Sequence, residues 1–151
     1  MTHRFDEDRA RGVKDRRFSA MSSRHIDRMG YLAEWRAAYE LGLWGDDAMA
    51  IDGPDRGYDL LLRSHRLEVK WISYDRLREF VIPPVRATAD IVVAVFGSTE
   101  DRLHIQGWLT KAEVMRFPLA TLARSGKRLP KPGHMVPTEA LHDMRSLRRL
   151  A

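Results

Sequence analysis

Residues 58–72 read YDLLLRSHRLEVKWI. Two runs of β-prone residues, 58–62 and 67–72, flank the polar residues 63–66. This pattern predicts an antiparallel hairpin with a four-residue loop. The pairing of the two strands then determines which of their side chains meet.

Three charged side chains of this hairpin are expected to share one face. Successive side chains of a strand point to opposite faces, so Glu68 and Lys70 project together, whereas Val69 points the other way into apolar packing. The hairpin brings Asp59 of the first strand alongside this pair. The sequence therefore predicts two carboxylates and an ammonium on one surface of a small sheet.

This grouping has the composition of a metal site for phosphodiester hydrolysis. The carboxylates of Asp59 and Glu68 and the backbone carbonyl of Val69 are oxygen ligands, which suit Mg²⁺ or Mn²⁺. A divalent ion stabilises charge in the transition state and lowers the pKa of a bound water. Lys70 would orient that water or offset the added negative charge. A Glu-X-Lys pattern alone is also typical of the solvent face of a hairpin.

A helix is predicted before the hairpin, over residues 24–41. Its apolar residues recur mostly at helical spacing, and Ser22 or Ser23 is positioned to cap its start. Gly42 and Gly45 follow its end.

Further strands are predicted after the hairpin. Residues 80–82 form a short extended piece that two prolines stop, and residues 102–109 form another strand. Residues 89–96 are almost continuously apolar, which predicts a strand buried on both faces.

The C-terminal part is predicted to be helical and loop-like. Thr110 and Glu113 match a capping box, which favours a helix over 111–116. Residues 124–137 are rich in Gly, Pro and basic side chains and predict a loop. Residues 138–150 carry apolar side chains at the spacing of a terminal amphipathic helix.

The chain is expected to form one mixed α/β domain over 23–151, preceded by a basic flexible arm at 1–22. Its 151 residues suit one domain. No apolar run approaches the roughly 20 residues that span a bilayer, and no secretory signal is recognisable. Cysteine is absent, which excludes disulfides and thiolate chemistry. We expect a cytoplasmic protein with no membrane partner.

The net charge of +5 is unevenly distributed. Residues 1–28 carry +3 and residues 124–151 carry +5, whereas residues 29–123 carry −3. Basic ends around an acidic centre suit a carboxylate site that must attract a polyanion. They would equally keep a protein soluble.

Asp59 followed by Glu68-Val69-Lys70 resembles the signature of the PD-(D/E)XK nuclease superfamily. Residues 30–34, reading GYLAE, resemble the segment of the first helix in which many members carry a glutamate. Residues 89–93 and 106–110 are similar to the archaeal-type Holliday-junction resolvases within this superfamily. The resemblance covers roughly residues 24–116.

Family membership would imply a restriction-endonuclease-like fold, in which helices flank a central mixed β-sheet. It would also imply a divalent metal, Mg²⁺ or Mn²⁺, and DNA as the usual substrate. Tyr58 stands where the signature has a proline, and residues 75–88 hold Pro83-Pro84 where many relatives place a helix.

The resemblance adds Glu34 as a catalytic residue that assists through a second metal or a metal-bound water. Glu34 is preferred because it follows Gly30 at the spacing of the family. Glu40 is the alternative on the same helix, but it lies six residues further on, about 120° around the helix axis.

Six further residues are candidate nucleic-acid contacts: His65, Gln106, Arg124, Lys127, Arg128 and Lys131. The histidine lies in the hairpin loop, the glutamine on a strand and the others in a basic loop. Structural or solvated roles are the alternatives. Trp71 and Trp108 are expected to be core residues rather than base-stacking platforms.

The sequence thus predicts a metal-dependent DNA endonuclease. Structure-selective cutting, similar to that of a Holliday-junction resolvase, is the leading subtype because no separate sequence-reading domain is recognisable. A homodimer able to cut two strands is a secondary expectation. The alternatives are a non-catalytic nucleic-acid-binding or assembly protein that keeps the fold, and an RNA-directed nuclease.

Overall fold

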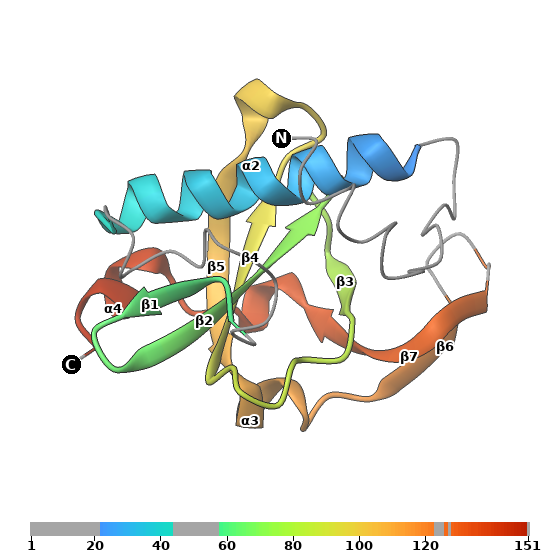
Figure 1. Cartoon of the computed structure of the whole chain (residues 1–151). Coiled ribbons are helices and arrows are strands. Elements are labelled where there is room, and N and C mark those ends of the chain that lie inside the picture. The colour runs from blue at the N-terminus through green and yellow to red at the C-terminus, as the bar shows by residue number, and fades with distance from the viewer. Residues whose placement is uncertain (1–21, 44–57, 123–125, 127, 151) are drawn as a thin grey trace.

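The structure is a computed structural model, and it describes residues 22–43, 58–122, 126 and 128–150. These residues form a four-stranded sheet with the long helix α2 across one face, a three-stranded sheet and short connecting helices (Figure 1). The chain is therefore of the mixed α/β class, as predicted. The predicted arm at 1–22 lies outside the described residues, apart from Ser22.

Helix α2 spans Ser23–Leu41, close to the predicted range of 24–41. The Oγ of Ser22 accepts a hydrogen bond from the backbone N–H of His25, which caps the free amides of the first turn. The helix ends at Gly42, whose φ of 68° is in the left-handed region that glycine adopts without strain.

The first sheet has the strand order β1-β2-β4-β5. Its strands are β1 (Leu60–Leu62), β2 (His65–Ile72), β4 (Ile91–Phe96) and β5 (His104–Thr110). β2 pairs antiparallel with β1 and parallel with β4, and β4 pairs antiparallel with β5, so the sheet is mixed. All six residues of β4 are buried, which confirms the predicted two-sided burial of this strand.

The hairpin forms where it was predicted, but its loop is two residues long rather than four. Leu62 pairs directly with His65, so only Arg63 and Ser64 connect the strands. Arg63 adopts a φ of 54°, the positive value that tight hairpin loops require at their first position. The sequence did not indicate this loop because arginine is uncommon in that conformation.

The second sheet has the strand order β3-β7-β6, and most of it was not predicted. β3 (Glu79–Ile82) agrees with the expected extended piece, but β6 (Leu119–Leu122) was not expected, and β7 (Arg128–Pro137) replaces the predicted loop over 124–137. The prediction of a loop was wrong because prolines were counted against a strand.

The prolines of β7 are tolerated because of their positions in the sheet. β3 pairs only with residues 134–137 of β7. Pro130 and Pro132 lie in the part of β7 beside β6, next to a break in the register between Ala120 and Leu122. Because the pairing of the two strands is irregular there, a proline does not remove a hydrogen bond that regular pairing would need.

The second sheet packs on the face of the first sheet that is turned away from α2. Phe80 and Ile82 of β3 and Val136 of β7 share one buried cluster with Val92 and Phe96 of β4. The rings of Phe80 and Phe96 meet edge to face, with centroids 5.2 Å apart. Within the described residues, a sheet supplemented by the short helix α3 (Lys111–Val114) covers this second face.

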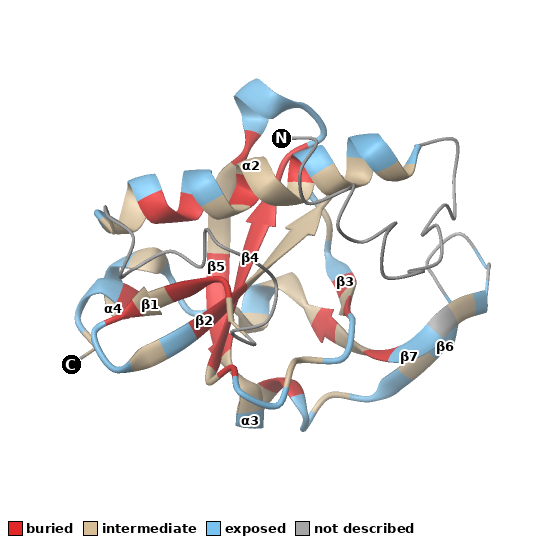
Figure 2. Ribbon diagram, in the orientation of Figure 1, coloured by how far each residue is buried: buried red, intermediate tan, exposed pale blue. Residues whose placement is uncertain are grey.

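Helix α2 covers the other face of the first sheet. Its buried Met29 and Ala33 lie in a separate apolar cluster with Leu67 of β2 and Val93 of β4. Figure 2 shows the buried residues concentrated in β4 and along the side of α2 that meets the sheet. The first sheet is therefore sandwiched between two apolar layers, and a polar side chain on it needs a specific partner.

The predicted terminal helix over 138–150 is wrong in extent. The chain forms a short 3₁₀ helix, η3 (Thr138–Ala140), a β-bridge between His142 and Trp108, and helix α4 (Met144–Arg148). Leu141 packs into the apolar layer of the second sheet, whereas Leu147 is buried in the layer under α2. Between the two leucines the chain leaves the helical conformation to form the bridge at His142, and this takes it from one layer to the other.

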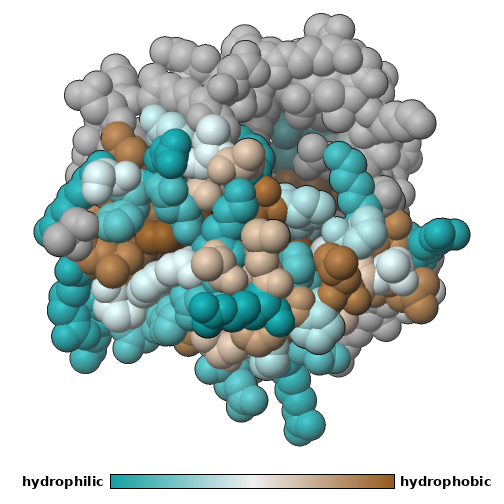
Figure 3. All heavy atoms as spheres, turned by 90° about the horizontal axis from the view of Figure 1, so that it is seen from below, coloured by the Kyte–Doolittle hydropathy of each residue, from teal (hydrophilic) through white to brown (hydrophobic). Residues whose placement is uncertain are grey.

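Exposed large apolar side chains are dispersed over the molecule. They include Trp35 and Tyr39 on α2 and Leu119 and Leu122 on β6. Seen from below, hydrophobic residues form several separate groups among hydrophilic ones (Figure 3). None of the described helices combines the length and the apolar character needed to cross a membrane.

Candidate functional site

The alternation of side chains along β2 separates its charged residues from its apolar ones, as predicted. Leu67, Val69 and Trp71 pack with the layer under α2, and the Trp71 ring meets the His25 ring of α2 at 5.9 Å. Glu68 and Lys70 point to the opposite face, toward the second sheet. Glu68 is buried, with only 3% of its surface exposed.

Asp59 lies immediately before β1 and extends the pairing of the hairpin with its side chain. Its backbone N–H donates to the carbonyl of Leu67, and its Oδ2 accepts from the backbone N–H of Val69 at 2.7 Å. The carboxylate thus accepts the hydrogen bond that a backbone carbonyl would accept if β1 were longer. This contact holds Asp59, itself only 8% exposed, beside Glu68.

Arg86, on the segment between β3 and β4, bridges the two carboxylates. Its Nη2 donates to Oδ1 of Asp59 at 2.7 Å, and its Nε donates to Oε1 of Glu68 at 3.1 Å. The backbone N–H of Arg86 donates to Oε2 of Glu68 at 3.0 Å. One residue therefore binds both acids with three donors.

Lys70 completes the cluster. Its Nζ lies 3.0 Å from Oε1 of Glu68, and its side chain is 21% exposed. The four side chains of Asp59, Glu68, Lys70 and Arg86 carry two negative and two positive charges, so the cluster is neutral. Burying two carboxylates would be costly without this compensation.

Burial on its own lowers the pKa of the Arg86 guanidinium. The charges and hydrogen bonds of Asp59 and Glu68 outweigh burial, and the net result is a pKa above the ordinary arginine value. Arg86 is therefore a permanent cation in the cluster, as arginine is elsewhere.

The segment that carries Arg86 is anchored at several points. Lys111 Nζ donates to the backbone carbonyls of Arg86 and Ala87 at 3.4 and 3.3 Å. At the end of the segment, Asp90 accepts the Arg66 guanidinium through both carboxylate oxygens, at 3.2 and 3.1 Å. The hydrogen bonds from the side chain and backbone of Arg66 hold the pKa of Asp90 below its ordinary value. The backbone of Arg86 is thus held in place while its long side chain spans the acids.

The donor set of the cluster suits a divalent cation. Two carboxylates converge on one point, which is the guanidinium that both contact. The N–H and C=O of one strand residue point to the same side, so the carbonyl of Val69 points toward Asp59, as its N–H does. Mg²⁺ is commonly held by one or two carboxylates with waters completing its shell. A divalent ion and the guanidinium of Arg86 would compete for the same oxygens.

Glu34 lies apart from the three hairpin residues. It sits on α2 one turn before the buried Ala38 and is half-buried on the side of the helix that meets the sheet. That helix covers the face opposite to Glu68. Within the described residues, no three His, Asp or Glu side chains form a metal-binding group. The role of Glu34 in catalysis stays a prediction.

Glu40, the alternative to Glu34, has a structural role. Its Oε2 accepts from the backbone N–H of Ile105 at 3.1 Å, and its Oε1 contacts Arg36 at 3.3 Å. The pairing of β4 with β5 shifts so that Gln106 is an extra residue, and such a bulge disturbs the regular hydrogen bonds nearby. Glu40 satisfies one of the affected amides.

The other candidate contacts are dispersed. His65 begins β2 and is half-buried, and the side chain of Gln106 pairs with the ring of His104 at 3.1 Å. Arg128 and Lys131 are exposed on β7. The remaining two, Arg124 and Lys127, lie outside the described residues.

The two tryptophans predicted to be core residues are held by hydrogen bonds. Trp108 is 6% exposed, and its Nε1 lies 2.9 Å from the carbonyl of Asp143 and 3.0 Å from Oγ of Ser146. Trp71 donates to the carbonyl of Gly97. These contacts agree with the predicted core roles.

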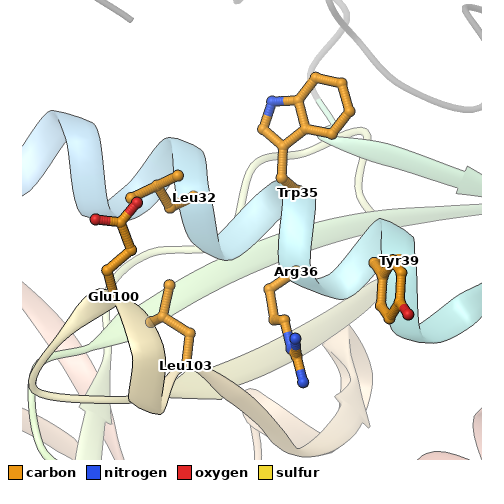
Figure 4. Close-up of a pocket in the computed structure, with 6 residues that line it drawn as sticks. All are labelled: Leu32, Trp35, Arg36, Tyr39, Glu100 and Leu103. Carbon is orange, nitrogen blue, oxygen red and sulfur yellow. The ribbon is translucent and has the colours of Figure 1, made fainter.

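A shallow pocket lies between α2 and the segment before β5, away from the cluster. It is lined by Leu32, Trp35, Arg36, Tyr39, Glu100 and Leu103 (Figure 4). Its wall is mostly apolar, and its acid, Glu100, is already paired with Arg28 at 2.9 Å. Its two charged residues, Arg36 and Glu100, are exposed and each is already ion-paired, so the charged cluster with its two buried acids is the better candidate site.

Arg86 is the residue of this cluster that sequence reasoning missed. It lies 16 residues beyond Lys70, in the segment where the proline pair interrupts the family pattern. The available signal was that two acids on one face of a sheet need cationic partners if that face becomes covered. Lys70 alone could not neutralise both acids. Several arginines between Lys70 and the next predicted strand could have supplied the second positive charge, and the sequence did not distinguish among them.

No protein-family model matches the chain, and no curated protein and no solved structure is significantly similar to it.

Proposed function

We propose that the chain is a metal-dependent nuclease that hydrolyses phosphodiester bonds in DNA, with a fold of the restriction-endonuclease-like type. The observation that carries the proposal is the convergence of Asp59, Glu68 and Lys70 on one face of a mixed sheet. Two buried acids and a neighbouring ammonium are expensive to maintain, and such arrangements are concentrated at functional sites.

Each member of the cluster has a distinct role in this proposal. Asp59 and Glu68, with the carbonyl of Val69, would hold Mg²⁺ or Mn²⁺. The bound ion would supply charge stabilisation and a water of lowered pKa. Lys70 is partly exposed and would orient the attacking water or contact the phosphate. Glu34 is not part of this proposed mechanism, because α2 covers the face of the sheet opposite to Glu68.

DNA is proposed as the substrate because of the charge distribution and the family resemblance. The exposed Arg128 and Lys131 on β7 would contact the backbone. His65 of the hairpin, Gln106 of β5 and the basic residues Arg124 and Lys127 are the further proposed contacts. A structure-selective endonuclease acting as a homodimer in the cytoplasm remains the more detailed form of this proposal.

The proposal is tested by cleavage of linear and branched DNA, and of RNA, in Mg²⁺ and in Mn²⁺. We expect wild type to cut DNA only with a divalent ion, and Asp59→Ala and Lys70→Ala to lose at least ~100-fold in rate. Asp101→Asn removes an exposed carboxylate outside the cluster and should cut as wild type does. Cleavage that persists unchanged in both cluster variants would refute the assignment of the active site to this cluster. Preferential cutting of RNA would show that RNA, and not DNA, is the substrate.

A second candidate is a nucleic-acid-binding or assembly protein that keeps the fold without cutting. It is favoured by one observation: Asp59 and Glu68 have a hydrogen-bond donor on each of their four oxygens, from Arg86 and Val69. Such a cluster can stabilise the fold as a buried ion pair without binding a metal. DNA binding without cleavage in any divalent metal would support this candidate.

A further inference from the structure

The position of Arg86 has a consequence for how metal and nucleic acid would bind together. Its guanidinium lies where Asp59 and Glu68 converge, with contacts of 2.7 and 3.1 Å. A divalent ion held by both acids needs the same oxygens. The two cations therefore exclude each other unless the side chain of Arg86 moves.

Arg86 can release the acids without disturbing the fold around it. Its side chain is 31% exposed, whereas those of Asp59 and Glu68 are 9% and 4% exposed. Its backbone is held independently of its guanidinium, through its N–H to Glu68 and its carbonyl to Lys111. The guanidinium can thus swing toward solvent from a fixed backbone.

A phosphodiester is a suitable alternative partner for the released side chain. Arginine binds phosphate through paired N–H donors as well as it binds carboxylate. A nucleic-acid backbone arriving at the cluster would offer Arg86 an anion in place of the acids. The acids would then be open to a divalent ion, whose charge also favours the phosphate.

We propose that Arg86 is an exchangeable counter-cation that holds Asp59 and Glu68 closed to metal until a nucleic-acid phosphate draws its guanidinium away. This inference rests on the proposed nuclease function. It makes the binding of divalent metal and of nucleic acid mutually reinforcing, because each ligand favours the state in which Arg86 has left the acids. Arg86 is a positioning residue, acting on metal affinity through the two acids.

The test is a Mn²⁺ titration of the full chain, followed by the electron paramagnetic resonance of free Mn²⁺. Without DNA, Arg86→Gln should bind Mn²⁺ at least roughly fivefold more tightly than wild type. Arg102→Gln is the matched control, because it removes the same charge from an exposed pair with Asp75. It should bind Mn²⁺ as wild type does. Equal or weaker binding by folded Arg86→Gln would overturn the inference.

The second arm is decided by wild type with and without DNA, so its outcome does not depend on the folding of a variant. The titration is repeated on ice with a short DNA duplex, with a duplex-only blank and a gel showing that the duplex is intact. DNA should tighten Mn²⁺ binding by wild type at least roughly fivefold, and by Arg86→Gln clearly less. An unchanged Mn²⁺ affinity of wild type overturns the inference.

The two proposals fail in different ways. If the chain cleaves DNA with a divalent metal but DNA does not change its affinity for Mn²⁺, only the proposed role of Arg86 is refuted. Absence of Mn²⁺ binding by wild type and by Arg86→Gln, with no cleavage, would remove the proposed nuclease and this inference together. Both proposals predict that Asp59→Asn loses Mn²⁺ binding.

Discussion

Nη2 of Arg86 lies 2.7 Å from Oδ1 of Asp59, although the two residues are 27 positions apart in the chain. This contact joins the start of the hairpin to the segment between the two sheets. The same guanidinium reaches Glu68, so one side chain links the two buried acids.

Replacing Arg86 with methionine should destabilise the fold, because it leaves two buried carboxylates with Lys70 as their remaining cation. Breaking a fully buried pair costs roughly 3–5 kcal/mol, and the partial exposure of Arg86 reduces our expectation to about 2 kcal/mol. Urea denaturation measures this loss. The triple variant Asp59→Asn, Glu68→Gln, Arg86→Gln should recover at least half of it, because neutral amides need no counter-charge. A triple variant no more stable than the single one would contradict the electrostatic explanation.

Replacing Lys70 with methionine should separate cleavage from binding. Methionine keeps much of the length of lysine but removes the ammonium 3.0 Å from Glu68. We expect the rate of DNA cleavage at saturating metal to fall ~100-fold or more, whereas the dissociation constant for DNA changes only several-fold. The rate is measured under single-turnover conditions and binding by fluorescence anisotropy. Parallel losses in both quantities would assign Lys70 to DNA binding alone.

Gly107→Ala should weaken the docking of the C-terminal segment on β5. A Cβ at position 107 would lie 2.6 Å from the carbonyl oxygen of His142 and from Cβ of Leu141. Such a clash forces the backbones apart and typically costs about 1–3 kcal/mol. Gly30→Ala is the matched control, because a Cβ there meets nothing within 4 Å in a helix interior. That change should stabilise the fold by about 0.5–1 kcal/mol. Equal unfolding midpoints for the two variants would contradict the tight contact at Gly107.

Stability should fall at acid pH partly through Asp90. Hydrogen bonds from Arg66 lower its pKa in the folded chain below the ordinary value of 3.8. The unfolded chain therefore takes up the proton first, so the stabilisation is complete above pH 3.8 and is lost as the pH falls toward the folded pKa. Asp90→Asn should be less stable than wild type near neutral pH, and the difference should shrink below that value. Thermal unfolding at a series of pH values measures it, and a difference that grows on acidification would contradict the sign.

The sequence by itself determined the features that depend on short spacings. The helix at Ser23–Leu41, the capping box of Thr110 and Glu113, the strand 91–96 and the shared face of Glu68 and Lys70 all follow from local periodicity and capping. These preferences act between residues close together in the chain. They therefore survive in almost any tertiary context.

Only the tertiary structure decided the features that depend on which segments meet. β7 forms through its prolines because β3 and β6 pair with different parts of it. The C-terminal segment breaks into short helices because Leu141 and Leu147 belong to different apolar layers. Arg86 joins Asp59 and Glu68 because buried charges must find a partner, and the partner is selected by distance in space.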